Sequence, residues 1–395
     1  MKKFKTIIGM WVALSVILLA GCVDKFEANI SEMPIEGLVI EGDIISDSTV
    51  VFHLNKKLPL TFTDENDVFY DDYMNVDAEL SVMGSDGTSW IGQALGEGQY
   101  RVEIGTLKPE VEYHLVVKYG GDTYQSAPQK PLTTVGIENL RFIQPDLNGP
   151  VIILLNSEEG DVDDSKYYLW HFEEDWELRA EYVTTSLYNE VYNKIERFDY
   201  PPVAQGWRYK VADQYVLGTT ESMVMNQIID KTLHSIKNTD NRLSVLYSIR
   251  VYQRSLTQRE YEYYYIRAKL NKDMGGLFTP QPSELPSNIT CSNPLRKAIG
   301  YVGCNMTVSQ SQLYIPTEEV AYVNKFDCAF GQEPAGGNRD KFKAGFQTCD
   351  DTPSWARIEC VDITKLSADP QGRPEWWPNP YLYYKETPAV GDDKQ

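Results

Sequence analysis

The segment Leu107-Lys108-Pro109-Glu110-Val111-Glu112-Tyr113-His114-Leu115-Val116-Val117 carries the strongest local signal in the chain. A turn of the form Leu-x-Pro is followed by Tyr113, which opens an alternating strand. A tyrosine at this place is typical of the corner where a chain crosses between the two sheets of a β-sandwich. The segment therefore predicts a sandwich of antiparallel sheets around it.

Short alternating segments surround this corner, at residues 38–40, 50–54, 78–82, 99–104 and 123–126. Turn signals separate them, and Gly87 takes the left-handed position of a predicted hairpin. About seven strands in about 100 residues is the size of one immunoglobulin-like or fibronectin type III-like sandwich. We expect a mainly β protein in which residues 36–135 form that sandwich and residues 136–395 a larger β-rich domain with few helices.

The second region contains strand-like runs at residues 151–155, 167–172 and 243–254, and then one clear helix. The sequence Thr257-Gln258-Arg259-Glu260 predicts a capping box at the start of that helix. Tyr261, Tyr264, Tyr265 and Ala268 then fall on one helical face. We interpret this tyrosine stripe as core packing in preference to a platform for a ligand.

Charge and composition exclude one class of partner and favour a binding function. The net charge is -20, and loss of Lys2, Lys3 and Lys5 with a signal peptide would make it more negative. Nucleic acid is therefore excluded as a partner, because phosphates require a basic surface. The chain has 26 tyrosines but only 4 histidines, which favours β structure and binding surfaces over acid–base catalysis.

No catalytic residue or cofactor site is predicted. The sequence contains no phosphate-binding glycine loop, no His-Glu-x-x-His and no Gly-x-Ser-x-Gly. His171 and Glu174 form a superficial pair, but alternate residues of a strand face opposite sides, and we expect no second histidine nearby. We therefore interpret His171 as a structural residue.

The N-terminus predicts a lipoprotein. Three lysines precede an apolar run over residues 7–20, and Leu19-Ala20-Gly21-Cys22 closes it. We expect residues 1–21 to be a signal peptide, acyl chains such as palmitate to modify Cys22, and residues 22–35 to form a tether. The alternative is a buried N-terminal helix. Asp24 and Glu27 fit loosely a signal for export to the cell surface, and equally a plain solvated linker.

The remaining cysteines favour disulfides near the C-terminus. Cys291, Cys304, Cys328, Cys349 and Cys360 leave at least one thiol unpaired, and their spacing does not select a pairing. A zinc site is disfavoured because no Cys-x-x-Cys occurs. The acidic loop at residues 64–72 is either a calcium site or a solvated loop, and its spacing favours the latter.

Trp355, Trp376 and Trp377 are the candidate binding aromatics. Tryptophan faces bury the C–H surfaces of sugar rings, so these residues predict a possible glycan platform. The alternative interpretation is core and edge packing beside the disulfides.

Several segments together resemble one family. They are the lipoprotein-type N-terminus and residues 38–42, 167–177, 247–257, 275–282, 299–302 and 360–377. The chain resembles the outer-membrane lipoproteins of unknown function of Bacteroidota, which are commonly encoded beside TonB-dependent transporters. The resemblance implies an immunoglobulin-like module and a β-rich domain at the outer membrane, with a transporter as partner. It transfers no catalytic residues.

We therefore expect a non-enzymatic lipoprotein, anchored in the outer membrane and exposed at the cell surface. Its expected role is that of an accessory subunit of a TonB-dependent transporter or related barrel, in docking or cargo capture. Two alternatives stay open, namely a structural subunit of an envelope assembly machine and a surface glycan-binding protein.

Overall fold

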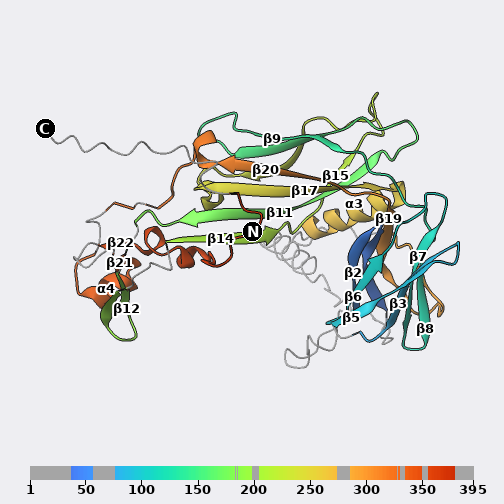
Figure 1. Cartoon of the computed structure of the whole chain (residues 1–395), viewed down its shortest axis with the longest axis horizontal. Coiled ribbons are helices and arrows are strands. Elements are labelled where there is room, and N and C mark those ends of the chain that lie inside the picture. Colours follow the sequence, from blue (N-terminus) through green and yellow to red (C-terminus); the bar gives the residue numbers. More distant parts are fainter. Residues whose placement is uncertain are drawn as a thin grey trace, which may run out of the picture.

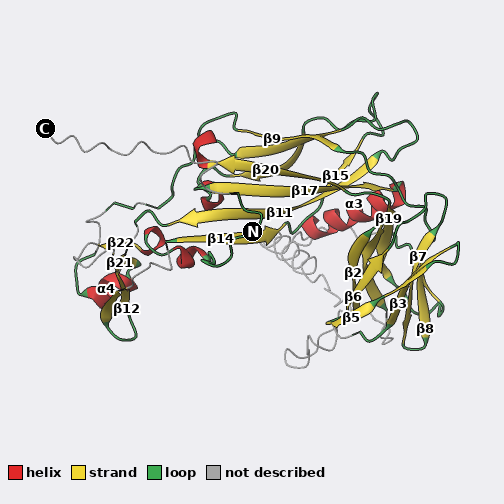
Figure 2. Ribbon diagram, viewed as in Figure 1, coloured by secondary structure: helices red, strands yellow, loops and turns green. Residues whose placement is uncertain are grey.

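The chain builds two β-sandwiches and a small third lobe, arranged along its longest axis (Figures 1 and 2). The computed structural model describes residues 37–56, 76–182, 184, 186–197, 204–273, 285–326, 328–329, 334–348 and 355–378. The described residues are mainly β, with two α-helices, as the sequence predicts. Cys22, the lipoprotein signal and the acidic loop lie outside the described residues.

The first sandwich consists of two five-stranded sheets. In spatial order, one sheet contains β19 (Ile299–Asn305), β1 (Leu38–Ile45), β2 (Ser48–Lys56), β6 (Gln99–Ile104) and β5 (Gln93–Gly96). The other sheet contains β18 (Ile289–Cys291), β8 (Asp122–Ser126), β7 (Tyr113–Tyr119), β3 (Glu79–Gly84) and β4 (Ser89–Ile91). Along β2, Val50, Phe52 and Leu54 point into the core while Val51 and His53 are exposed. This alternation is the period that predicted the strand.

The boundary expected at residue 135 does not hold for this sandwich. β18 and β19 complete its two sheets, although in the chain both lie between β17 and β20 of the second sandwich. β19 lies parallel to β1 along the register from Val39–Ile299 to Ile45–Asn305. The division into residues 36–135 and 136–395 is therefore wrong for residues 289–305, because strand pairing between distant segments leaves no local signal.

The tyrosine corner is present. The Tyr113 hydroxyl accepts a hydrogen bond from the Lys108 backbone amide at 2.9 Å, and both the tyrosine ring and Leu107 are buried. Gly87 has a φ of 88° in the hairpin between β3 and β4, as expected. The corner therefore ties the start of β7 to the turn that precedes it.

Replacing Tyr113 by phenylalanine should lower the free energy of unfolding by about 1 kcal/mol, because the Lys108 amide loses its acceptor. Urea denaturation of the full chain measures this change. The matched control is Tyr192→Phe, since Tyr192 is exposed. Equal stability of the two variants would show that the corner hydrogen bond does not contribute.

The second sandwich packs a three-stranded sheet on a five-stranded sheet. The first contains β16 (Lys231–Ile236), β10 (Val151–Ser157) and β9 (Ile137–Ile143); the second contains β14 (Gln205–Val211), β11 (Tyr167–Arg179), β17 (Leu246–Leu256) and β20 (Ser309–Pro316), with β15 (Val216–Thr219) also on β11. Trp170, Tyr247 and Ile249 are fully buried between them. The three predicted strands correspond to β10, β11 and β17.

One helix lies between the two sandwiches. This is α3 (Gln258–Asp273), and the Thr257 hydroxyl accepts from the Glu260 amide at 3.2 Å, which is the first half of the predicted capping box. The tyrosine stripe differs from the expectation. Tyr263 and Tyr264 are buried, whereas Tyr265 is 56% exposed. The helix therefore packs through Tyr263 and Tyr264 and is open on the side of Tyr265, a difference that spacing alone does not reveal.

The third lobe contains short elements joined by a disulfide. They are β12 (Ser186–Asn189), β13 (Lys194–Arg197), α4 (Asn338–Lys343), β21 (Phe346–Thr348) and β22 (Trp355–Arg357). Single-turn helices occur at Asn241–Leu243, Thr317–Glu319, Ile358–Cys360 and Ile363–Leu366. Cys328 and Cys360 form the disulfide, with Cα atoms 5.8 Å apart. Cys291 and Cys304 are free thiols, and Cys349 lies outside the described residues.

Candidate functional site

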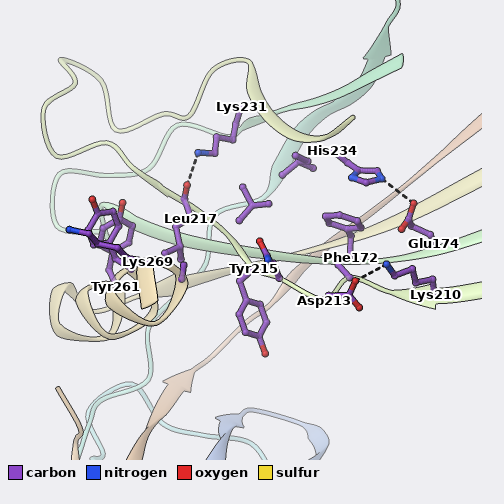
Figure 3. Close-up of a pocket in the computed structure, with 16 residues that line it drawn as sticks. Phe172, Glu174, Lys210, Asp213, Tyr215, Leu217, Lys231, His234, Tyr261 and Lys269 are labelled. Carbon is purple, nitrogen blue, oxygen red and sulfur yellow. Dashed lines mark hydrogen bonds and ion pairs between the residues drawn. The ribbon is translucent and has the colours of Figure 1, made fainter. Parts of the chain in front are cut away.

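An open cleft of about 720 Å³ lies between α3 and the second sandwich (Figure 3). Strands β11, β15 and β16, the segment that follows β14, and one side of α3 supply its walls. The lining residues are Phe172, Glu174, Lys210, Ala212, Asp213, Gln214, Tyr215, Val216, Leu217, Lys231, Leu233, His234, Tyr261, Tyr265, Ala268 and Lys269. The volume falls in the range of small-molecule sites.

An interruption in an edge strand opens this cleft. β14 pairs with β11 as far as Val211 opposite Glu173, and β15 resumes with Val216 opposite Trp170. Residues 212–215 therefore face only two residues of β11, and the Ala212 amide still donates to the Phe172 carbonyl at 2.9 Å. Such insertions bend a strand and redirect its side chains. Here they direct residues 212–215 into the cleft wall.

A bulge in β16 shapes the opposite wall. Ile153 pairs with His234 and Leu154 with Thr232, so that Leu233 is the extra residue. In a regular strand, Leu233 and His234 would face opposite sides. The bulge breaks this alternation, and Lys231, Leu233 and His234 all line the cleft.

Glu174 lies at one end of the cleft, and three neighbouring side chains contact its carboxylate. Its Oε1 lies 2.6 Å from Arg242 Nη1, 2.8 Å from the Tyr247 hydroxyl and 3.2 Å from His234 Nε2. Burial raises the pKa of Glu174, but the hydrogen bond from His234 and the charge of Arg242 outweigh it, and the pKa lies below its ordinary value. The group is ionised at neutral pH and held by three donors.

The expectation about histidines is wrong in one respect. His171 is structural, as predicted: its ring stacks on Tyr252 at 4.6 Å, and burial lowers its pKa. However, His234 does lie beside Glu174. Its position depends on the pairing of β16 with β10, and no local pattern reveals that pairing. The residues that line the cleft include no serine, threonine or cysteine.

The lysines give the cleft an unbalanced positive charge. Lys210 pairs with Asp213 at 2.7 Å, and Glu174 pairs with Arg242. Lys231 Nζ donates to the Leu217 carbonyl at 2.5 Å and lies 5.8 Å from the centre of the Trp170 ring. Burial lowers the pKa of Lys231. Among the ion pairs of the described residues, neither Lys231 nor Lys269 takes part.

Tyrosines form the side of the cleft that α3 and the interrupted edge strand provide. The rings of Tyr261 and Tyr265 are stacked 6.3 Å apart, and Tyr215 meets Tyr264 edge-on at 5.3 Å. Tyr215 is 47% exposed. The interpretation of the tyrosine stripe as core packing is therefore wrong for the exposed Tyr265, whereas Tyr261 packs against the core beside Tyr167 and also lines the cleft.

The other predicted site residues lie elsewhere. Trp355 and Trp377 are buried, so their faces are closed to a sugar ring, and only Trp376 is partly exposed, at 38%. The Arg250 guanidinium covers the Trp376 ring at 4.7 Å. Trp355 packs in the third lobe, Trp376 and Trp377 pack against the second sandwich, and the three do not form a glycan platform.

Two further searches give negative findings for the described part of the chain. No group of three or more His, Cys, Asp or Glu residues there is arranged to hold a metal ion. None of the helices described is long and apolar enough to cross a membrane. The acidic loop at residues 64–72, the calcium candidate, lies outside the described residues.

A buried ion cluster fixes α3 against the first sandwich. Arg254 of β17 lies 2.5 Å from Glu260 of α3 and 3.2 Å from Asp43 of β1. The side chains of Arg254 and Glu260 are almost fully buried. The cluster therefore joins three elements and positions the helix that walls the cleft.

Glu260 predicts a pH dependence of stability. Burial raises the pKa of Glu260 to about 7, against the opposing effect of Arg254. The folded chain thus holds this proton more tightly than the unfolded chain, in which the pKa is near 4.5. The contribution is fully present below pH 4.5, and the free energy of unfolding should fall as pH rises from about 4.5 to 7.

Denaturation at several pH values tests this sign. The free energy of unfolding of Glu260→Gln, which cannot ionise, should fall less between pH 5 and pH 7 than that of the unaltered chain. Asp175, whose pKa burial raises to about 6, contributes in the same window to both proteins. If the free energy of unfolding falls equally with pH in Glu260→Gln and in the unaltered chain, the raised pKa of Glu260 is contradicted.

Together these observations define a class of protein: two β-sandwiches joined by strands from distant segments, with a helix-walled cleft on the second. A family model described as a domain of unknown function, DUF4249, matches residues 23–311. The chain belongs to this family. The matched span includes the strands of the first sandwich, α3, every residue that lines the cleft, and the second sandwich except the last residues of β20.

Other comparisons add little. No curated protein matches the chain. A solved structure of a two-domain fibronectin type III segment from chicken tenascin is similar over 56% of this chain and 92% of its own, at 10% identity and a TM-score of 0.14. The fold described above rests on the strands and their pairing.

Proposed function

We propose that this chain is a non-enzymatic lipoprotein of the outer membrane, of the kind found in Bacteroidota, that captures cargo for a TonB-dependent transporter or a related barrel. The cleft beside α3 is the observation that carries the proposal. It is open and built on strands and one helix. It is lined by aromatic rings and by two cations, Lys231 and Lys269, that form no ion pair with another described residue.

The polar groups of the cleft support binding over catalysis. Glu174 is ionised and held by three donors, whereas a general acid or base must be free to exchange a proton with substrate. The N-terminal sequence through Cys22 supports anchoring, because two acyl chains give stable attachment. Anchoring keeps the cleft close to a barrel in the same membrane.

Affinity purification from detergent-solubilised membranes tests the role. A tagged chain at native abundance should recover an outer-membrane β-barrel, and Cys22→Ser, which removes the acylated thiol, should recover much less. Recovery of the lipoprotein alone would contradict the proposal. A deletion that causes general envelope defects without loss of one nutrient's uptake would instead favour a structural subunit of an assembly machine.

A further inference from the structure

We propose that the cleft beside α3 binds small organic carboxylates, with the anionic group at Lys231 and the apolar body against Phe172, Leu233 and Tyr261. This inference deepens the proposed function by naming the chemical class of the cargo. It rests on the lining of the cleft, on the contacts of one lysine, and on the charge of the whole chain.

Lys231 is the anchor for the anion. It projects from β16 towards Leu217, whose carbonyl accepts one of its three N–H groups (Figure 3). The other donors have no carboxylate among the described residues. A partly buried ammonium without a counter-ion is electrostatically unfavourable, and an incoming carboxylate would correct this imbalance.

The surroundings select an anion over a cation. The chain as a whole carries a net charge of -20, yet the two carboxylates that line the cleft are both neutralised, Glu174 by Arg242 and Asp213 by Lys210. Lys269 on α3 adds a second cation at the same cleft. The local excess of positive charge therefore attracts an anion, while the rest of the surface repels it.

The apolar part of the lining favours a ligand with a flat or compact hydrophobic group beside its carboxylate. Phe172 and Leu233 are buried residues that line the cleft, and the stacked rings of Tyr261 and Tyr265 of α3 line it as well. A purely inorganic anion would leave these surfaces in contact with water. An aromatic carboxylate would cover them and contact Lys231 at the same time.

Isothermal titration calorimetry with the full lipoprotein in detergent micelles tests the inference. The probes are indole-3-acetate, its neutral analogue indole-3-acetamide, and acetyl-Gly-Gly-Phe with a free or an amidated C-terminus. Indole-3-acetate should bind at least tenfold more tightly than the amide. Binding of the free-acid peptide, but not of indole-3-acetate, would assign the carboxylate to a peptide end and overturn the small-molecule class.

Variants separate the role of Lys231 in binding from a structural role. Lys231→Gln should weaken the affinity for indole-3-acetate about tenfold, because a charge-assisted hydrogen bond is lost, whereas Lys237→Gln, at an exposed position just after β16, should not change it. The melting temperature of Lys231→Gln without ligand should be unchanged or higher, because burial disfavours the charge.

Three further results would overturn the inference. They are equal affinity for acid and amide, no binding of either probe at millimolar concentration, and a lower melting temperature for Lys231→Gln with unchanged binding. None of them bears on recovery of a barrel from membranes, so failure of the ligand assignment and failure of the proposed role are distinguishable.

Discussion

Replacing Arg254 by methionine is expected to lower the free energy of unfolding by about 3–5 kcal/mol, because two carboxylates then remain beside each other without their cation in a buried site. Arg254 lies within 3.2 Å of Asp43 on the first sandwich and within 2.5 Å of Glu260 on α3. Urea denaturation of the full chain measures the loss.

The matched control is Arg250→Met on the same strand. Arg250 contacts Glu173 at 3.4 Å and both side chains are partly exposed, so about 1 kcal/mol is expected. A similar small loss for both variants would show that the buried cluster does not join the sandwiches. Because the same cluster positions α3, Arg254→Met should also lower the affinity of the cleft for its ligand.

Gly300→Ala should disrupt the first sandwich, with a loss of about 3 kcal/mol or more in the free energy of unfolding. A Cβ atom at Gly300 would lie 1.9 Å from the Ile40 carbonyl oxygen of β1, and its φ is 140°. The close approach is required because β19 pairs in parallel with β1 at this point. Hydrogen exchange should show faster exchange of the β19 amides.

Gly121→Ala is the matched control for Gly300→Ala, because it introduces backbone strain without a steric clash. Gly121 has a φ of 83°, but a Cβ atom there meets nothing within 4 Å. The expected loss is only about 1–2 kcal/mol, from the left-handed backbone alone. If Gly300→Ala is no more destabilising than Gly121→Ala, β19 does not pair with β1 as described.

Local patterns predicted the local features well. The turn before Tyr113 predicted the tyrosine corner, and Gly87 predicted the hairpin, because both depend on the conformation of a few neighbouring residues. The alternation along β2 predicted a half-buried strand for the same reason. The start of α3 at Thr257 was also predictable, since a cap is formed within one turn.

Features that depend on distant pairing could not be predicted in this way. Ile299–Asn305 reads as one more strand, and nothing in it shows that its partner is β1 and not a neighbour in the chain. The cleft depends on two irregularities of pairing, at residues 212–215 and at Leu233. Both result from register, which a single sequence does not specify.

The tyrosine stripe and the cysteines show the same limit. Helical spacing placed Tyr261, Tyr264 and Tyr265 on one face, but α3 is packed on one side and open on another, which spacing cannot distinguish. Five cysteines left their pairing open, and the bond between Cys328 and Cys360 follows from the path of the third lobe. The sequence identified these residues but not the environments around them.

Anchoring through Cys22 is the central claim, since capture for a barrel requires a protein held at the same membrane. Mass spectrometry of the N-terminal peptide from fractionated cells tests it most directly. The account predicts a mature chain that begins at Cys22, carries diacylglycerol on its sulfur and separates with the outer membrane. An unmodified Cys22, in a chain found free in the periplasm, would contradict it.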